Sequence, residues 1–355
     1  MWSCLPQELL VKIFGNIDSK PQLAECRLVC RFWHSQVDAI LLAEHIILDS
    51  DHDVLQLYKF LNGNPARGSL VKHLTLRGSH YNEYLLSQLV HVVFSPTLEK
   101  FEGQLEGCGS DILLEINCKA LDDTSGFDRL TVLPSPQEFT LMYFNTLLKF
   151  KQSLQSMALY LSDLDHSLEQ QYIMTHVPGF AAVVVLDLKI KINDVTDVEE
   201  VLQHFDRLEQ LTIELDTECA FIMSEKRLQE WTASSVTVVD SLDTLEVKGC
   251  FFGDVFEYLC YKYANVNSIK LDISEYLTPS LLIPAYNTMS REQITIQSKR
   301  ISQQVISKIS RAGIHLPETG PIQLECLALL QNDTAHLKYD EERKLITCII
   351  SLTEE

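Results

Sequence analysis

The stretch LEVKGCFFGDVFEYLCYKYANVNSIKL runs from Leu245 to Leu271 and has a short apolar pattern near each end. The pattern is an apolar residue, two residues of any type, a second apolar residue, one residue of any type and a third apolar residue. Its two copies here are Leu242, Leu245, Val247, which begins three residues before the stretch, and Val266, Ile269, Leu271. Alternating apolar residues are typical of a short strand that is buried on one face. The stretch therefore predicts a strand, a returning segment and a second strand.

The same pattern recurs through most of the chain. Neighbouring copies lie between 24 and 34 residues apart, and a period of about 20 to 29 with some insertions is typical of leucine-rich repeats. Two copies are incomplete, because Gly103 takes the last position of one and Arg291 the first position of the other. In such an array no unit is stable without its neighbours. The central residues of the copies are Leu74, Phe101, Leu130, Met157, Leu186, Leu211, Leu245, Ile269, Ile294 and Leu327.

The segments between the copies predict helices. A first strand is predicted at 45–49, and the apolar run 345–352 predicts a strand that closes the last unit. Apolar residues have helical spacing within 54–61, 85–93 and 198–205.

The stretch 245–271 resembles the cysteine-containing class of leucine-rich repeats, with Gly249 and Cys250 after the strand and Cys260 in the returning helix. The resemblance implies parallel strands on a concave face and helices on a convex face. Cys108 follows Gly107 in the same way as Cys250 follows Gly249. We interpret these cysteines as small buried residues, not as ligands or nucleophiles. The chain departs from the family in lacking the Asn that follows most strands.

The N-terminal segment has a different apolar pattern. In LPQELLVKIF, from Leu5 to Phe14, the residues Leu10, Ile13 and Phe14 begin one face of a short helix, and Pro6 suits its first turn. Pro21 opens a second helix in the same way. The apolar residues between Leu23 and Val37 exceed what about 40 residues can bury alone. Part of this apolar surface is therefore expected to face something else.

This segment resembles an F-box, a three-helix module. Leu5 and Pro6 match the opening of the family pattern, Ile13 and Phe14 match its paired anchors in the first helix, and Val29 to Trp33 match its close. The resemblance implies binding to a Skp-type adaptor, which recruits a cullin that carries the ubiquitin-transfer machinery. The alternative is an ordinary helical hairpin that caps the repeats. The adaptor-binding residues implied are Leu5, Pro6, Leu9, Leu10, Ile13, Phe14, Val29, Cys30 and Trp33.

Composition and the absence of known motifs argue against several classes of function. A formal net charge of −20 argues against a nucleic-acid partner, because phosphate binding requires clustered Lys and Arg. No apolar run reaches the length of a membrane span, and the N-terminus lacks a signal-peptide pattern, so we expect a cytoplasmic or nuclear protein. The ten cysteines form no C-x-x-C pair, and no nucleophile, phosphate-loop or zinc motif is present. We therefore expect no metal, no cofactor and no catalysis by this chain.

These observations predict an α/β protein with an F-box at 1–43 and a leucine-rich-repeat solenoid with terminal caps at 44–355. It resembles the F-box and leucine-rich-repeat proteins, of the fungal type. The resemblance implies a non-catalytic substrate-recognition subunit of a ubiquitin ligase. The alternative function is a ligase-independent binding or scaffold protein that still uses the adaptor.

A protein substrate is expected on the concave face, where residues between and just after the apolar anchors project. This surface is polar and mixed in sign, so it suits a peptide that carries both charges. An ordinary solvated sheet face is an equally good interpretation. The predicted contacts are Arg77, Tyr160, Asp187, Lys189, Glu214, Glu246, Lys248, Lys270 and Asp272.

Overall fold

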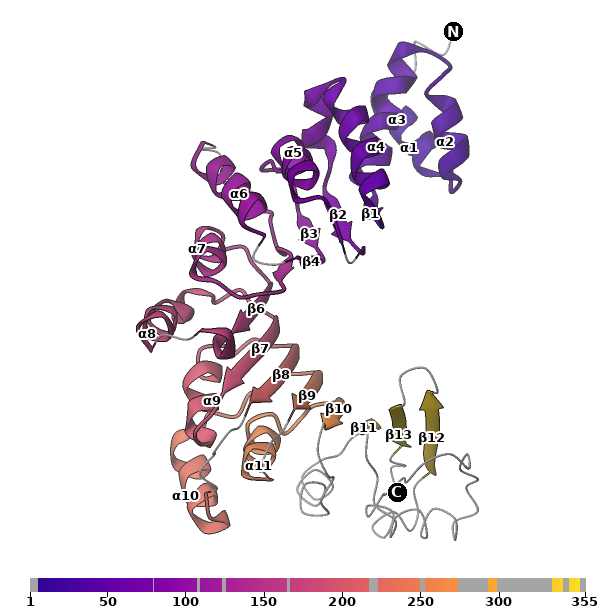
Figure 1. Cartoon of the computed structure of the whole chain (residues 1–355). Helices are drawn as coiled ribbons and strands as arrows, with labels where there is room; N and C mark the ends of the chain where they lie inside the picture. The colour runs from indigo at the N-terminus through magenta and orange to yellow at the C-terminus, as the bar shows by residue number, and fades with distance from the viewer. Residues whose placement is uncertain are drawn as a thin grey trace. The chain divides into compact units, whose positions relative to one another are not determined.

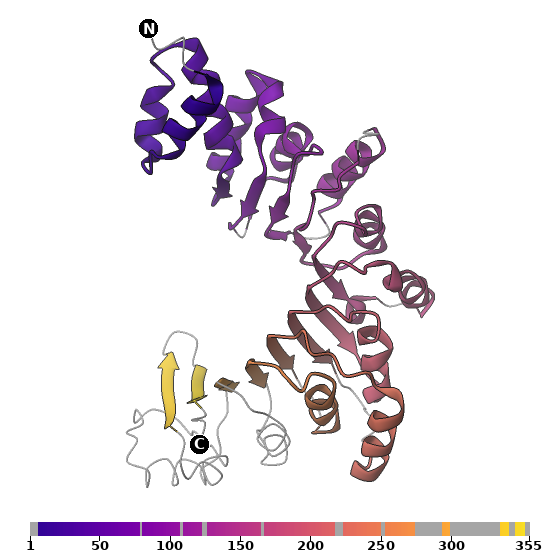
Figure 2. The same ribbon diagram turned by 180° about the vertical axis from the view of Figure 1, so that it is seen from behind.

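The computed structural model describes residues 6–78, 80–106, 109–122, 126–164, 167–216, 223–249, 253–273, 293–298, 334–340 and 345–351. The chain divides into two compact units, Met1–Met157 and Ala158–Glu355, each taken by itself below. In each unit parallel strands carry helices on one side (Figures 1 and 2). The mixed α/β class is confirmed.

The first unit begins with three helices, α1 (Gln7–Gly15), α2 (Lys20–Cys26) and α3 (Arg31–Ala43). Polar side chains cap two of them: the Ser19 hydroxyl accepts from the Gln22 N–H, and the Cys30 Sγ accepts from the Trp33 N–H. A small core holds the helices together, and the Phe14 ring meets the Trp33 ring edge-on at 5.0 Å. The buried residues of this core are Leu10, Phe14, Leu23 and Val37.

Strands and helices then alternate. A three-stranded parallel sheet has the order β1-β2-β3, and β4 pairs with β5 in a second, two-stranded sheet. The predicted first strand and the helices predicted at 54–61 and 85–93 are confirmed by β1, α4 and α5. The elements are β1 (His45–Leu48), α4 (Asp51–Asn62), η2 (Pro65–Leu70), β2 (His73–Leu76), α5 (Glu83–Val93), β3 (Lys100–Glu102), β4 (Gln104–Leu105), α6 (Ser110–Asp122), β5 (Ser135–Pro136) and α7 (Leu141–Lys149).

The pairing of the strands tests the predicted repeat register. Leu74 pairs with Phe101, as predicted, although Gly103 makes that copy incomplete. The prediction that Leu130 is the central residue of its copy was wrong by three residues. Val132 bridges to Lys100 and to Ser156, so Leu133 occupies the place between Phe101 and Met157. Leu133 is buried whereas Val132 is only half-buried, which places Leu133 on the interior face.

Strand β6 (Ser156–Tyr160) crosses the boundary between the units and is the edge of an eight-stranded sheet with the order β12-β13-β11-β10-β9-β8-β7-β6. Strands β7 to β11 are parallel, and β13 pairs antiparallel with β11 and β12. The further elements are η3 (Leu161–Asp163), α8 (Ser167–His176), η4 (Val177–Gly179), β7 (Val185–Lys191), α9 (Val195–Leu202), β8 (Gln210–Asp216), α10 (Glu225–Ser235), β9 (Thr244–Gly249), α11 (Gly253–Lys262), β10 (Ser268–Ile273), β11 (Gln293–Ser298), β12 (Thr334–Asp340) and β13 (Leu345–Ser351).

The register of this sheet agrees with the repeat pattern at every parallel pair from β7 to β11. The predicted central residues pair in the order Leu186, Leu211, Leu245, Ile269 and Ile294. Burial alternates along β7, because the side chains of Leu186, Leu188 and Ile190 are buried and the residues between them are half-buried. The apolar spacing therefore predicted which residues lie side by side.

A charged cluster is buried beneath this sheet. Lys262 of α11 is 1% exposed, and its Nζ donates to both carboxylate oxygens of Glu199 on α9, at 3.1 and 2.7 Å. Tyr258 donates its hydroxyl to the same carboxylate. Burial, with the nearby Tyr263 and Glu199, raises the pKa of Tyr258 well above its usual value. These contacts join α9 to α11. They also pair the Lys262 ammonium, whose burial without a partner would be costly.

Some predicted features lie outside the described residues. They are Leu5, Cys108, Cys250 and the repeat centred on Leu327. Cys260, which is described, is buried within α11 as predicted.

Candidate functional site

The three N-terminal helices leave large apolar side chains in solvent. Leu9 and Ile13 are 47% and 46% exposed on one side of α1, and Val29 is 59% exposed in the turn before α3. The contact between Phe14 and Trp33 shows that the second half of α1 adjoins the start of α3. Exposed apolar side chains on adjoining elements are typical of a protein–protein interaction site.

The structure separates the predicted adaptor contacts into two groups. Leu10 and Phe14 are 0% and 1% exposed, so we correct their assignment: they form the core of the helical module and do not reach its surface. Trp33 is half-buried against that core. Leu9, Ile13 and Val29 remain as exposed apolar residues, whose contact with an adaptor stays a prediction.

Two other predicted contacts have local structural roles. Pro6 occupies the N-cap position of α1 in an extended conformation and is exposed. Cys30 caps α3, because its Sγ lies 3.5 Å from the Trp33 N–H. The closing Cys-Arg-Phe-Trp run therefore begins a helix and at the same time places Phe32 at the surface.

Three further exposed apolar residues were not among the predicted contacts. They are Val11 on α1, Leu28 in the turn between α2 and α3, and Phe32 in the first turn of α3. Leu28 is the most exposed of them, at 86%. The excess of apolar residues between Leu23 and Val37 was the available signal, but spacing alone did not show which of them face solvent.

The predicted substrate residues of the second unit whose side chains the structure describes lie on the sheet face opposite the buried side chains. Asp187, Thr212, Glu246 and Lys270 are successive partners across β7 to β10, and Lys189, Glu214, Lys248 and Asp272 form the next row. The structure therefore brings these residues together in two rows. Arg77 belongs to the first unit, where its Nε lies 3.7 Å from the Asp49 carboxylate.

Most of these charges already have partners within the face. The Tyr160 hydroxyl donates to Asp187 at 2.7 Å, and the Lys189 Nζ lies 3.8 Å from the Glu214 carboxylate. The Glu246 carboxylate lies 2.7 Å from the Lys270 Nζ and 3.5 Å from the Lys248 Nζ. Burial alone would raise the pKa of Glu246, but these two lysines hold it below its usual value. A ligand on this face would have to compete with pairs that the protein itself supplies.

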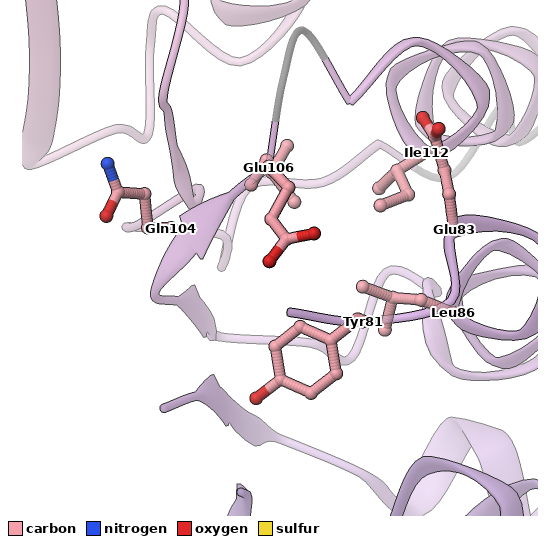
Figure 3. A pocket seen from close by; sticks show the side chains of 7 residues that line it. Tyr81, Glu83, Leu86, Gln104, Glu106 and Ile112 are labelled. Atoms are coloured by element: carbon pink, nitrogen blue, oxygen red, sulfur yellow. The ribbon is translucent and has the colours of Figure 1, made fainter. Parts of the chain in front are cut away.

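The described part of the first unit also contains a pocket of about 200 Å³. Leu86, Leu105 and Ile112 form its apolar lining, and Figure 3 shows Glu106 pointing toward the ring of Tyr81. The Tyr81 hydroxyl donates to the Leu48 carbonyl and accepts from the Gly78 N–H, both at 2.6 Å, and burial raises the pKa of Tyr81. The pocket is smaller than a typical small-molecule site and has room for about one side chain. No sequence pattern predicted it.

The described residues contain no group of three or more His, Cys, Asp or Glu side chains arranged to hold a metal ion. Among the helices that the structure describes, none combines the length and apolar character that crossing a membrane requires.

In the comparison with protein families, residues 2–49 match the F-box-like family. The match covers the three helices and β1, so the chain carries an F-box-like domain, which supports its assignment as an F-box protein. Domains of this kind typically bind Skp-type adaptors. A search of curated proteins found no significant relative. The F-box prediction is thereby supported, and the leucine-rich-repeat and fungal assignments stay predictions.

Proposed function

We propose that this protein is the substrate-recognition subunit of a Skp, cullin and F-box ubiquitin ligase. The observation that carries the proposal is the exposed apolar surface of the F-box-like domain, formed by Leu9, Ile13, Leu28, Val29 and Phe32. Solvent exposure of so many large apolar side chains on one small module is costly unless a partner covers them. A Skp-type adaptor is the partner that an F-box-like domain most often has.

The proposed mechanism is proximity. The repeats would bind a protein substrate while the F-box binds the adaptor, and the cullin bound to that adaptor would bring the ubiquitin-charged enzyme. Attack by a substrate lysine then becomes effectively intramolecular, which lowers the entropic cost of reaching the transition state. The chain itself supplies no catalytic group in this mechanism.

The substrate-binding part of the proposal concerns the paired charges of β7 to β10. Their half-buried side chains are fixed by neighbours, so they offer a preformed pattern of both signs. Rigid charge pairs favour selectivity more than affinity. The alternative, a ligase-independent scaffold, uses the same adaptor surface but brings no cullin.

Affinity purification of the tagged full chain from cells tests the proposal. We expect the adaptor and a cullin to be captured together, and both to be lost from the Ile13→Asp, Val29→Asp double variant. The Leu121→Asp variant is the matched control, because Leu121 is an exposed apolar residue of α6, outside the F-box-like domain. Capture of the adaptor without any cullin would favour the scaffold, and capture of neither by the wild type would contradict both functions.

The lifetime of the captured partners gives the second measurement. A substrate of a ligase should persist longer in cells when the F-box variant replaces the wild type. A cytoplasmic or nuclear location is part of the same proposal, since the ubiquitin machinery acts there.

A further inference from the structure

A buried carboxylate joins the F-box-like domain to the first repeat, by which we mean β1, α4 and η2. Asp38 of α3 is 4% exposed, and each of its oxygens lies within ion-pair distance of a different arginine, with the His34 Nε2 also 3.2 Å from Oδ2. The Arg27 Nε lies 2.7 Å from Oδ1, and the Arg67 Nε lies 2.8 Å from Oδ2. Arg27 follows α2 within the helical module, whereas Arg67 belongs to η2 in the repeat region. The carboxylate is therefore held from both sides of the connection.

The same two arginines share further partners. Both guanidinium groups lie over the ring of Phe60 on α4, at 4.8 Å for Arg27 and 4.4 Å for Arg67. Both also lie within hydrogen-bonding distance of the His34 Nε2, at 3.3 and 2.9 Å. Arg67 adds a bond from Nη1 to the Phe60 carbonyl at 3.2 Å. A guanidinium group that forms an ion pair and also stacks on a ring is held in both direction and distance.

The connection between α3 and β1 is very short. Helix α3 ends at Ala43 and strand β1 begins at His45, so Glu44 alone separates them, in an extended conformation. The side chains of Arg27 and Arg67 are 24% and 17% exposed, so solvent screens their contacts with Asp38 only partly. A one-residue connection with a buried polar cluster differs from the flexible linkers that usually separate domains.

We propose that Arg67, acting through Asp38 together with Arg27, is a positioning residue: it fixes the orientation of the F-box-like domain relative to the first repeat. The consequence for ubiquitin transfer rests on the proposed function. A fixed orientation at this joint removes one source of variation in the separation between the adaptor and the substrate, and misplacement of reacting groups by about 1 Å can cost on the order of a hundredfold in rate. Arg67 is placed to control transfer without touching the adaptor or the substrate.

The first test measures distance and is independent of any ligase. Spectroscopic probes are placed at Gln22 of α2 and Tyr84 of α5, both exposed, through unnatural amino acids because the chain has ten cysteines. We expect one narrow distance distribution for the wild type and a clearly broader one for Arg67→Ala. Arg129→Ala, which changes an exposed arginine of the same unit, should match the wild type. An equally narrow distribution for Arg67→Ala would overturn the proposal.

A conservative variant guards against loss of folding. Arg67→Lys keeps the positive charge but, without a planar guanidinium group, cannot both pair with the Asp38 carboxylate and stack on the Phe60 ring. If circular dichroism shows that Arg67→Ala is unfolded, Arg67→Lys decides: a broadened distribution supports the proposal, and a narrow one overturns it.

The second test measures ubiquitin transfer. With the assembled ligase and a captured substrate, we expect Arg67→Ala to capture adaptor and substrate as the wild type does but to transfer ubiquitin about tenfold more slowly or worse. Unchanged transfer by a variant with a broadened distribution would overturn the positioning role. Absence of transfer by the wild type would instead contradict the proposed function, and the distance measurement would still decide whether Arg67 fixes the joint.

Discussion

The F-box-like domain and the sheet of the second unit present opposite kinds of surface. The helical module exposes apolar side chains such as Leu28 and Val29, for which it supplies no cover of its own. The sheet face exposes charges, but Glu246, Lys248 and Lys270 already pair with one another. The apolar surface of the F-box-like domain is costly to expose without a partner, whereas charges on the sheet face are paired within the protein. Binding by the F-box-like domain should therefore be strong and apolar, and binding by the sheet face selective and weaker.

The largest loss of stability is expected from a substitution at a buried strand position of the second unit. Leu245 is 0% exposed between Leu211 and Ile269, so Leu245→Asp should bury an unpaired charge and destabilise the second unit by about 4 kcal/mol or more. Denaturant unfolding should show this as an early separate transition. Gln210→Asp, at an exposed position of β8, is the control and should change little. A wild-type unfolding curve for Leu245→Asp would contradict the shared interior.

The next effect concerns the buried polar cluster that joins α9 to α11. Removing the carboxylate with Glu199→Ala leaves the Lys262 ammonium buried without its ion pair, which should cost about 3 to 5 kcal/mol. Glu200→Ala, at the exposed neighbouring position, should cost far less. Chemical denaturation of both variants measures the difference, and equal losses would show that the buried pair is not needed.

Charge reversal on the sheet face should lower stability less than the two substitutions above, but it should change which substrates are captured. Reversing the charges of Asp187, Lys248 and Lys270 together should cost about 1 kcal/mol per broken pair, because these groups are partly exposed. The adaptor should still be captured, while the set of captured substrates changes. An unchanged set would show that this face is not the recognition surface.

The smallest effect is a dependence of stability on pH. The lysines beside Glu246 hold its pKa in the folded protein below the ordinary value of 4.5. A carboxyl with a lowered pKa stabilises the folded state above its unfolded pKa and loses that contribution as the pH falls through the folded pKa. The free energy of unfolding should therefore fall below about pH 4.5, and less steeply in Glu246→Gln. Identical pH profiles for the two proteins would contradict the pairing.

Much of the strand arrangement could be predicted from the sequence, because each apolar triplet marks one strand and its central residue fixes the register. Leu186, Leu211 and Leu245 pair as the pattern predicted. The prediction failed at Leu130: Phe127, Leu130 and Val132 fit the full pattern, whereas the alignment centred on Leu133 places the polar Ser135 in the last apolar position. Only the strand pairing showed that Leu133 takes the central place.

The candidate sites were less predictable, for a physical reason. A core face and a docking face of a short helix are both apolar, so spacing could not separate Phe14, which is buried, from Ile13, which is exposed. The joint at Asp38 depends on Arg27 and Arg67, which lie 40 residues apart in the sequence and meet only in the folded chain. Likewise, the pairing of Lys270 with Glu246 becomes visible only once the strand register is applied to the charges as well as to the apolar residues.

The affinity of the full chain for a purified Skp-type adaptor tests the central claim most directly. We expect Ile13→Asp, Val29→Asp to lower that affinity by a factor of roughly 30 or more, equivalent to about 2 kcal/mol, because interface anchors of this kind carry most of the binding energy. Thermal melting should stay near that of the wild type, since both side chains are exposed, and Leu121→Asp should bind normally. An unchanged affinity for the double variant would contradict the account, because the exposed apolar surface of the F-box-like domain would then not be where the adaptor binds.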